Sequence, residues 1–328
     1  MIRARMAARS EAEDDLGNVR RRAHRDARRC VDHLTQAMAM KFTFLGTGCP
    51  VASPMRAGPA HLVTGSRARL LIDCGAGVSQ RLVAAGERGA DIDALIVTHY
   101  HSDHVVDFYQ LLVSSWHQGR ARPFVVHAPA NVISHMRHIL EAYADERELR
   151  IAHERRPSSL GLEVEFHELA EGRAIRLGDL EAEPFSVDHR PVKPAFGLVL
   201  RQGKTRVVFS GDTRPVPALV EAARGAELLV CEVFVDREMM PTQGVRSAET
   251  IAAVRSYHLT PRQIAKIARD AGVMALALTH FVPPNADRSA LVAEIRKGFR
   301  GPVIVGEDLM SIDPALRTLS FAKLHLAY

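Results

Sequence analysis

From Lys41 onward, short runs of β-branched and apolar residues alternate with segments that have the period of an amphipathic helix. Each run stops at a glycine or a polar loop, as strands do. The expected strands are FTFLG, HLVTG, RLLIDCG, ALIVTH and residues 162–168, 184–188, 196–202 and 205–210, and the expected helices are 78–86, 106–117, 131–144, 215–224, 261–271 and 287–299. No Pro/Ser-rich linker separates the two halves. The pattern therefore predicts one layered α/β domain over residues 40–328, with two β-sheets inside and helices outside.

Residues 1–39 do not share this pattern. They are rich in Arg and Ala without a clear apolar stripe, so we expect a basic, mobile N-terminal extension. The first forty residues contain nine Arg and six acidic residues, a net charge of +3 out of the +5 of the whole chain. The basic character is therefore largely a property of the extension. It does not imply that the folded domain binds nucleic acid strongly.

The composition, with 47% hydrophobic and 25% charged residues, is that of an ordinary globular protein and excludes the fibrous and disordered classes. Cys30, Cys49, Cys74 and Cys231 are widely spaced and form no CxxC pair, which favours a reducing compartment over a disulfide framework. The sequence shows no secretory leader and no run of about 18 uncharged apolar residues. We therefore expect a cytoplasmic protein without a membrane span.

The segment Thr98–His104, THYHSDH, directly follows the buried-looking strand ALIV and contains three histidines and an aspartate within six positions. In a core this clustering would be costly, because every polar group needs a partner. Imidazole nitrogen and carboxylate oxygen are, however, preferred zinc ligands. In an extended turn His99 and His101 project to the same side, and Asp103 and His104 can then face a second ion. The alternative, a histidine-rich surface loop, accounts poorly for this spacing.

Three further potential ligands lie where expected strands end. His189 ends EPFSVDH, Asp212 follows RVVFSG, and His280 closes MALALTH. Any one of them alone would more often be structural. Because four strand ends carry ligand-type residues, the repeated placement favours a binuclear metal site at one edge of the sheets.

The sequence resembles the metallo-β-lactamase superfamily, and within it the branch that contains tRNase Z and the related arylsulfatase-type and phosphodiesterase enzymes. The resemblance covers residues 41 to about 310 and rests on FLGTGCP, LLIDCGAG, THYHSDH, VDHRPVKPAFG, FSGDTR, SYHLTPRQIAKIARDAG and LALTHF. It implies an αββα sandwich in which two mixed β-sheets are flanked by helices. THxHxDH is highly specific for the superfamily, whereas GTG and LID are only supportive.

The resemblance also implies a ligand set. The first Zn²⁺ would be held by His99, His101 and His189, the second by Asp103, His104 and His280, and Asp212 would bridge both. Mn²⁺ or iron is an alternative to zinc at such a site. Asp73 matches the carboxylate that braces the metal loop in these folds, which is a structural role.

His258 matches the histidine with which tRNase Z enzymes protonate the leaving group, and Glu232 falls where they carry a carboxylate that orients it. His258 lies just before Thr260, Pro261 and Gln263, which have the signature of a helix start. Such an acid is needed when the leaving group is an alkoxide, which favours phosphodiesters. The expected nucleophile is a metal-bridging hydroxide, because two zinc ions lower the pKa of water toward neutrality. Glu232 and Asp103 are also expected to be catalytic.

Two departures from tRNase Z concern the substrate. The long arm that grips tRNA is replaced by the four-residue turn 201–204, and the Arg-Tyr pair after the last metal histidine is replaced by residues 281–285, FVPPN. We therefore expect a small anionic ester as substrate more than tRNA. Arg190, Lys193 and Arg214 are expected to contact such an anion if they are not simply solvated.

Alternative functions remain open at this point. An arylsulfatase-like, lactone or amide hydrolase would use the same site, and tRNA 3′ processing or a metal-binding protein without turnover is less favoured. A homodimer is compatible with the sequence.

Overall fold

The computed structural model describes residues 39–328. The chain divides into two units, Met1–Ala39 and Met40–Tyr328, and all elements below belong to the second. Residues 1–38 of the expected mobile extension, which include Cys30, lie outside the described residues. In the described part, Cys49, Cys74 and Cys231 are free and buried. No helix of residues 39–328 is long and apolar enough to cross a bilayer.

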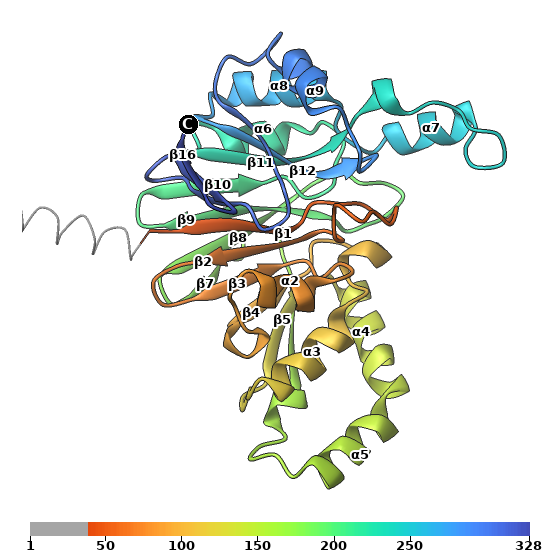
Figure 1. Ribbon diagram of the computed structural model, residues 1–328, viewed down its shortest axis with the longest axis vertical. Coiled ribbons are helices and arrows are strands. Elements are labelled where there is room, and N and C mark those ends of the chain that lie inside the picture. The colour runs from red at the N-terminus through yellow and green to blue at the C-terminus, as the bar shows by residue number, and fades with distance from the viewer. Residues whose placement is uncertain (1–38) are drawn as a thin grey trace, which may run out of the picture. The chain divides into compact units, whose positions relative to one another are not determined.

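Two β-sheets form the centre of the domain (Figure 1). The first sheet has the order β16-β15-β14-β1-β2-β3-β4-β5-β6, and the second has the order β13-β12-β11-β10-β9-β8-β7. The strands of the first sheet are β1 (Lys41–Gly46), β2 (Ala60–Thr64), β3 (Arg69–Ile72), β4 (Ala94–Ile96), β5 (Phe124–Ala128), β6 (Val164–Glu168), β14 (Ser311–Asp313), β15 (Thr318–Phe321) and β16 (Leu324–Ala327). Those of the second are β7 (Ile175–Leu177), β8 (Leu180–Ser186), β9 (Phe196–Gln202), β10 (Thr205–Phe209), β11 (Leu228–Phe234), β12 (Leu276–Val282) and β13 (Val303–Val305).

Helices cover the outer face of each sheet (Figure 1). The helices are α2 (Val78–Ala84), α3 (Phe108–His117), α4 (Ala130–Ala142), α5 (Ala144–Glu154), α6 (Pro217–Ala223), α7 (Ala248–Arg255), α8 (Pro261–Ala271) and α9 (Arg288–Ile295). Helices α2 to α4 pack on the first sheet, and α6, α8 and α9 pack on the second. Both sheets contain parallel and antiparallel pairs. The predicted fold class, two mixed sheets flanked by helices, is therefore confirmed.

Strand alternation explains why three cores form. In β11, Leu228 and Val230 enter the core between the two sheets, whereas Leu229 and Cys231 enter the core beneath the outer helices. A strand buried on both faces needs apolar residues at every position, and β11 reads LLVCEVF with all seven residues buried. Glu232 is the exception in this run, and it lies at the site described below.

The predicted start of α8 is observed. Thr260 and Gln263 form a reciprocal capping box, Pro261 occupies the first turn, and Gly272 ends the helix with a left-handed φ of 65°. The predicted helix 131–144 ends at Ala142, and a second helix, α5, follows. The predicted strand 184–188 is the end of β8, which starts at Leu180. Helix α7 and strands β5, β7, β11 and β13 to β16 were not predicted.

Candidate metal centre and catalytic site

The seven predicted metal ligands come from loops or strand ends of both sheets and lie together at one edge of the sandwich. His99 follows β4 of the first sheet, whereas His189 and Asp212 follow β8 and β10 of the second. His280 lies inside β12, two residues before its end. Asp103 and His104 belong to a single 3-10 turn, Ser102–His104. Strands that end at the same edge therefore bring together residues that are far apart in the sequence.

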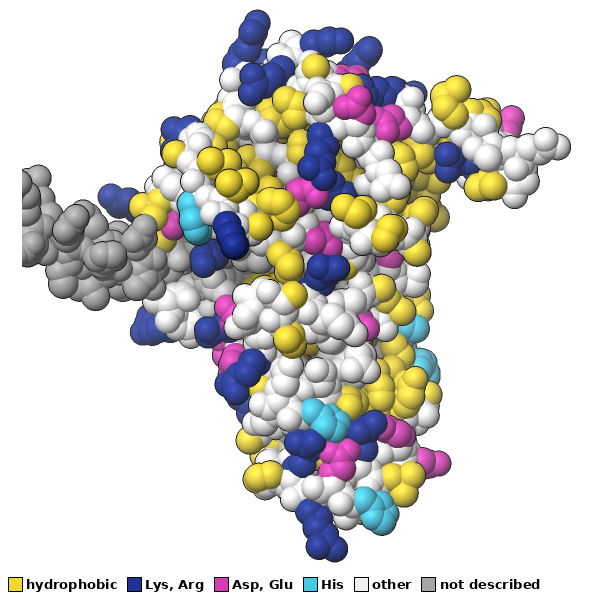
Figure 2. Space-filling model, viewed as in Figure 1, with side chains coloured by type: hydrophobic (Ala, Val, Ile, Leu, Met, Phe, Trp, Pro, Cys, Tyr) yellow, Lys and Arg dark blue, Asp and Glu magenta, His cyan; other side chains and the backbone are white. Residues whose placement is uncertain are grey.

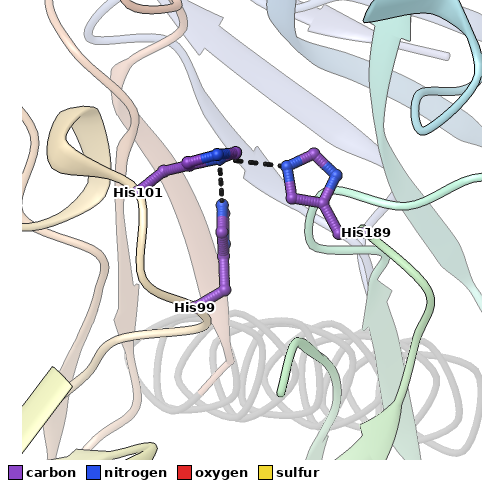
Figure 3. Close-up of side chains that lie close together, drawn as sticks. All are labelled: His99, His101 and His189. Atoms are coloured by element: carbon purple, nitrogen blue, oxygen red, sulfur yellow. Dashed lines mark hydrogen bonds between the residues drawn. The ribbon is translucent and has the colours of Figure 1, made fainter. Parts of the chain in front are cut away.

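Three imidazoles converge in the first group (Figure 3). His101 Nδ1 lies 3.1 Å from His99 Nε2 and 3.0 Å from His189 Nε2. The far nitrogens of two rings are occupied: His189 Nδ1 donates to the carbonyl of Tyr257, and His99 Nδ1 donates to Thr98 Oγ1. A neutral imidazole with one N–H engaged offers a lone pair at the other nitrogen, so His99 and His189 both present lone pairs to a common point. This arrangement fits a metal ion.

The second group contains Asp103, His104 and His280. Asp103 Oδ2 lies 3.4 Å from His280 Nε2 and 3.6 Å from His104 Nε2. His104 Nδ1 donates to Asp73 Oδ2 at 2.8 Å, whereas its buried Nε2 has no hydrogen-bond partner. A buried lone pair without a partner is costly unless a cation accepts it. The chemistry of these donors therefore also fits a metal ion.

Asp212 lies between the two groups. In the second group, its Oδ2 is 3.2 Å from His280 Nε2 and 3.4 Å from His104 Nε2. In the first group, the same oxygen is 4.0 Å from His99 Nε2 and 3.9 Å from His189 Nε2. One carboxylate oxygen in this position can serve two ions at once. The preceding residue, Gly211, has a φ of 57°, and a Cβ there would lie 2.4 Å from the carbonyl oxygen of Phe196. Only glycine allows this loop to approach β9 so closely.

Asp73 holds the metal loop in place, the role that the resemblance implied. Its Oδ1 accepts a hydrogen bond from the backbone N–H of Thr98 at 2.8 Å, and its Oδ2 accepts from His104. Asp73 and His280 both have positive φ values, 59° and 45°. Left-handed backbone at residues other than glycine is strained, and such strain clusters at functional sites.

Burial and charge set the protonation of the potential ligands. Burial lowers the pKa of His189 to about 4 and that of His99 well below its ordinary value, so both rings are neutral, as ligands must be. Burial would likewise lower the pKa of His280, but Asp212 and Asp103 raise it to about 9. Neighbouring imidazoles hold the pKa of Asp212 well below its ordinary value despite burial. Asp103 and Asp212 therefore attract positive charge.

A buried acid–imidazole pair adjoins this cluster. His258 Nδ1 lies 2.7 Å from Glu232 Oε2, and the two residues are 6% and 1% exposed. Glu232 Oε1 accepts from the backbone N–H groups of Thr213 and Leu259. The His258 ring centroid is 5.0 Å from that of His189. Because Nδ1 is held by the carboxylate, Nε2 is the nitrogen available for chemistry.

Burial favours the neutral form of each partner of this pair. It lowers the pKa of His258 to about 4 and, together with Asp212, raises that of Glu232 well above its ordinary value. The pair is therefore favoured in its uncharged form.

Of the three predicted anion contacts, Arg190 and Arg214 both donate to Asp188, with Nη2–Oδ2 distances of 2.5 and 2.7 Å. The backbone carbonyl of Lys193 accepts a hydrogen bond from Asn131 Nδ2. All three therefore lie on the loops that carry His189 and Asp212. The structure does not place them within the metal cluster itself.

Sequence reasoning missed the buried Arg56. Its guanidinium donates to Pro284 O, Gly306 O and Glu307 Oε1, and it lies 4.1 Å from the ring centroid of Phe281, the residue after His280. Arg56 thus links its own loop to the loops that contain Pro284 and residues 306–307, next to the second group. An isolated arginine in a loop gives no sequence signal for such a role.

Comparison with known proteins identifies the family. Residues 68–281 match the family described as the β-lactamase superfamily domain. A protein named ribonuclease Z from Mycobacterium bovis (strain BCG / Pasteur 1173P2) is 33% identical over 282 residues, which covers 84% of this chain and 98% of that protein. Another ribonuclease Z, from Mycobacterium sp. (strain KMS), is 34% identical over 281 residues, with 84% and 96% covered.

Solved structures share the fold. The metallo-β-lactamase fold protein YhfI from Bacillus subtilis has a TM-score of 0.63 at 18% identity, covering 84% of this chain and 98% of that one. Human tRNase Z, short form, has a TM-score of 0.62 at 21% identity, covering 83% and 98%. The chain therefore belongs to the β-lactamase superfamily and is a metal-dependent hydrolase similar to ribonuclease Z.

Proposed function

We propose that this protein hydrolyses phosphodiester bonds at a two-zinc centre, with His258 as the acid that protonates the leaving oxygen. The observation that carries the proposal is the buried Glu232–His258 pair, 2.7 Å apart, beside histidine and aspartate side chains that could hold metal ions. A hydrolase that cleaves only esters with good leaving groups would not need a positioned acid.

The residues present fit two ions. One would be held by His99, His101 and His189, the other by Asp103, His104 and His280, with Asp212 between them. Nitrogen and carboxylate donors suit zinc, although manganese and iron accept the same ligands. Two such ions would lower the pKa of water and neutralise charge on the attacked phosphoryl group.

The protein's own groups complete the reaction. Water adds to phosphorus, the bond from phosphorus to the leaving oxygen breaks, and the proton on His258 Nε2 passes to that oxygen. The products are an alcohol and a phosphomonoester, and the proton lost by the water restores His258. Glu232 keeps Nδ1 engaged, so that the ring stays oriented while its charge changes.

We propose RNA as the substrate class. The turn between β9 and β10 is as short as the sequence indicates, because Gln202 pairs directly with Thr205. The expectation of a small ester rested on this turn and on the replacement of the Arg-Tyr pair by residues 281–285. The relatives named ribonuclease Z match this chain over nearly their whole length, which does not favour a small ester over RNA. Nothing in the described residues favours a sulfate ester or a lactone.

The test compares substrates. Protein loaded with zinc, and separately with manganese, is assayed on a short RNA, on DNA of the same sequence and on bis(p-nitrophenyl) phosphate. We expect metal-dependent hydrolysis of the diesters, with the highest kcat/KM on RNA, and loss of activity with a chelator. Hydrolysis of an aryl sulfate or a lactone but of no phosphodiester would overturn the proposal.

A further inference from the structure

A cavity of about 650 Å³ opens beside His258. One wall is the loop after β10, with Arg214 and Pro215, and the opposite wall is α7. We call residues 236–257, which connect the end of β11 to His258 and include α7, the α7 segment. It projects from the body of the domain (Figure 1). His258 thus lies between the metal cluster and this cavity.

The polar groups around the cavity are mainly donors. Arg214 and Arg255 lie on opposite walls, and their carboxylate partners, Asp188 and Asp236, are not among the residues that line it. Gln263 also lines the cavity, and its Oε1 is already engaged by the helix cap, so its amide NH₂ is the group it offers a ligand. Among residues 39–328, no carboxylate lines the cavity. Its polar side therefore suits an anion.

Most of the remaining lining is apolar. Helix α7 contributes Ile251 and Ala252, and the facing loop contributes Pro215. No residue of α7 is buried, and Ala252 is exposed. Figure 2 shows mostly hydrophobic and uncharged side chains on the projecting α7 segment. The α7 wall is therefore left uncovered by the rest of the described chain and is available to a flat, apolar group.

From these observations we infer that the cavity binds the nucleotide on the leaving-group side of the scissile bond. The apolar walls contact its base and sugar, and Arg214 and Arg255 contact its additional phosphate. A nucleotide combines an apolar ring face with a charged phosphate, which matches donors on one side and an apolar wall on the other. Its ester oxygen would then reach His258, the one acid that lines the cavity. This inference rests on the proposed function and names the part of the RNA that this region recognises.

The first test measures binding without catalysis. Binding of adenosine 5′-monophosphate to the metal-free protein is measured by calorimetry for the wild type, R214A, R255A and R262A. Arg262 is the matched control, because it is an exposed arginine at the start of α8 that does not line the cavity. We expect each of the first two substitutions to weaken binding about fivefold or more, as for an exposed charge-assisted contact. R262A should bind as the wild type does.

The second test uses the metal-loaded protein. The dinucleotide ApA is compared with its forms carrying one extra phosphate at either end, and the products show which nucleotide leaves as the alcohol. An added phosphate on that nucleotide should raise kcat/KM about tenfold, and R255A should remove most of this gain, with partial rescue in R255K.

The outcomes separate the two proposals. Binding that is absent, or unchanged in both R214A and R255A, would overturn the cavity assignment, as would an equal gain from phosphate at either end. A third outcome is that adenosine 5′-monophosphate binds and R255A weakens this binding, but no dinucleotide is hydrolysed. This result would overturn the proposed function and would still support the cavity assignment.

Discussion

The metal cluster and the α7 segment meet at His258 but are built in opposite ways. The potential ligands are buried except for His101, which is partly exposed, and outer atoms of the buried ones are held by Asp73, Thr98 and the carbonyl of Tyr257. The α7 helix has no buried residue and projects from the domain. A reaction needs groups fixed before the substrate arrives, whereas a binding wall can stay open until the substrate covers it. We therefore expect substitutions in the cluster to affect chemistry, and substitutions in the α7 segment to affect substrate choice.

The largest effect is expected for Asp212→Ala. The affinity for both ions should fall together. Activity should fall by about 10⁴-fold or more, because both ions would contribute to catalysis. His189→Ala should weaken one ion only. Metal content by mass spectrometry and kcat/KM on RNA would measure both effects. A D212A protein that keeps both ions would contradict the bridging position of Asp212.

His258→Ala should come next. It should keep both metals but slow hydrolysis of a diester with an alkyl leaving group by about 10²- to 10⁴-fold, the usual contribution of a positioned acid. Bis(p-nitrophenyl) phosphate should lose far less, since nitrophenolate leaves without a proton. Equal losses on the two substrates would remove His258 from the acid role. Glu232→Gln is the companion variant and should show the same selectivity with a smaller loss.

Substitutions beneath the metal cluster and in the α7 segment should also differ in their effect on the free energy of unfolding. Arg56→Met removes a buried group with four hydrogen-bonded partners and should cost about 2–3 kcal/mol of unfolding free energy. Arg246→Met, in the exposed part of the α7 segment, should cost less than about 0.5 kcal/mol. Urea unfolding monitored by circular dichroism would compare them. Equal costs would show that the α7 segment is as tightly integrated as the loops beneath the cluster.

A smaller effect than that of Arg56→Met is expected at the end of the sandwich opposite the cluster, where Asp179 accepts hydrogen bonds from Ser66, Arg67 and Gln202. Burial would raise the pKa of Asp179, but these hydrogen bonds lower it below its ordinary value. The stabilisation is thus complete above the unfolded pKa of about 3.9 and is lost as pH falls toward the folded value. Asp179→Asn should cost about 1 kcal/mol at pH 7, a modest value because the group is partly exposed.

The pH dependence provides the control for this variant. The difference in urea midpoint between wild type and D179N should shrink as pH falls below about 4. A difference that stays constant down to pH 2 would show that the carboxylate charge is not what stabilises this turn.

The same contrast explains what the sequence could predict. Potential ligands such as His99 and His189 follow strands with strong apolar patterns, so their meeting at one edge could be predicted before the structure was known. The start of α8 could also be predicted from the sequence, because Thr260, Pro261 and Gln263, which form its capping box and first turn, lie close together in the chain.

Neither α5 nor α7 was predicted, because no residue of either helix is buried and neither needs an apolar stripe. Strands β13 to β16 have only three or four residues each, too few to show a period. The Arg56 contacts connect loops more than 200 residues apart, and no local pattern encodes them. Tertiary contacts of this kind appear only in the folded chain.

The central claim is that two metal ions lie side by side in the buried cluster. Anomalous diffraction from crystals of the zinc-loaded protein, collected on both sides of the zinc absorption edge, tests it directly. We predict two peaks, one among His99, His101 and His189 and the other among Asp103, His104 and His280, with Asp212 between them. A single peak, or peaks away from these residues, would contradict the account.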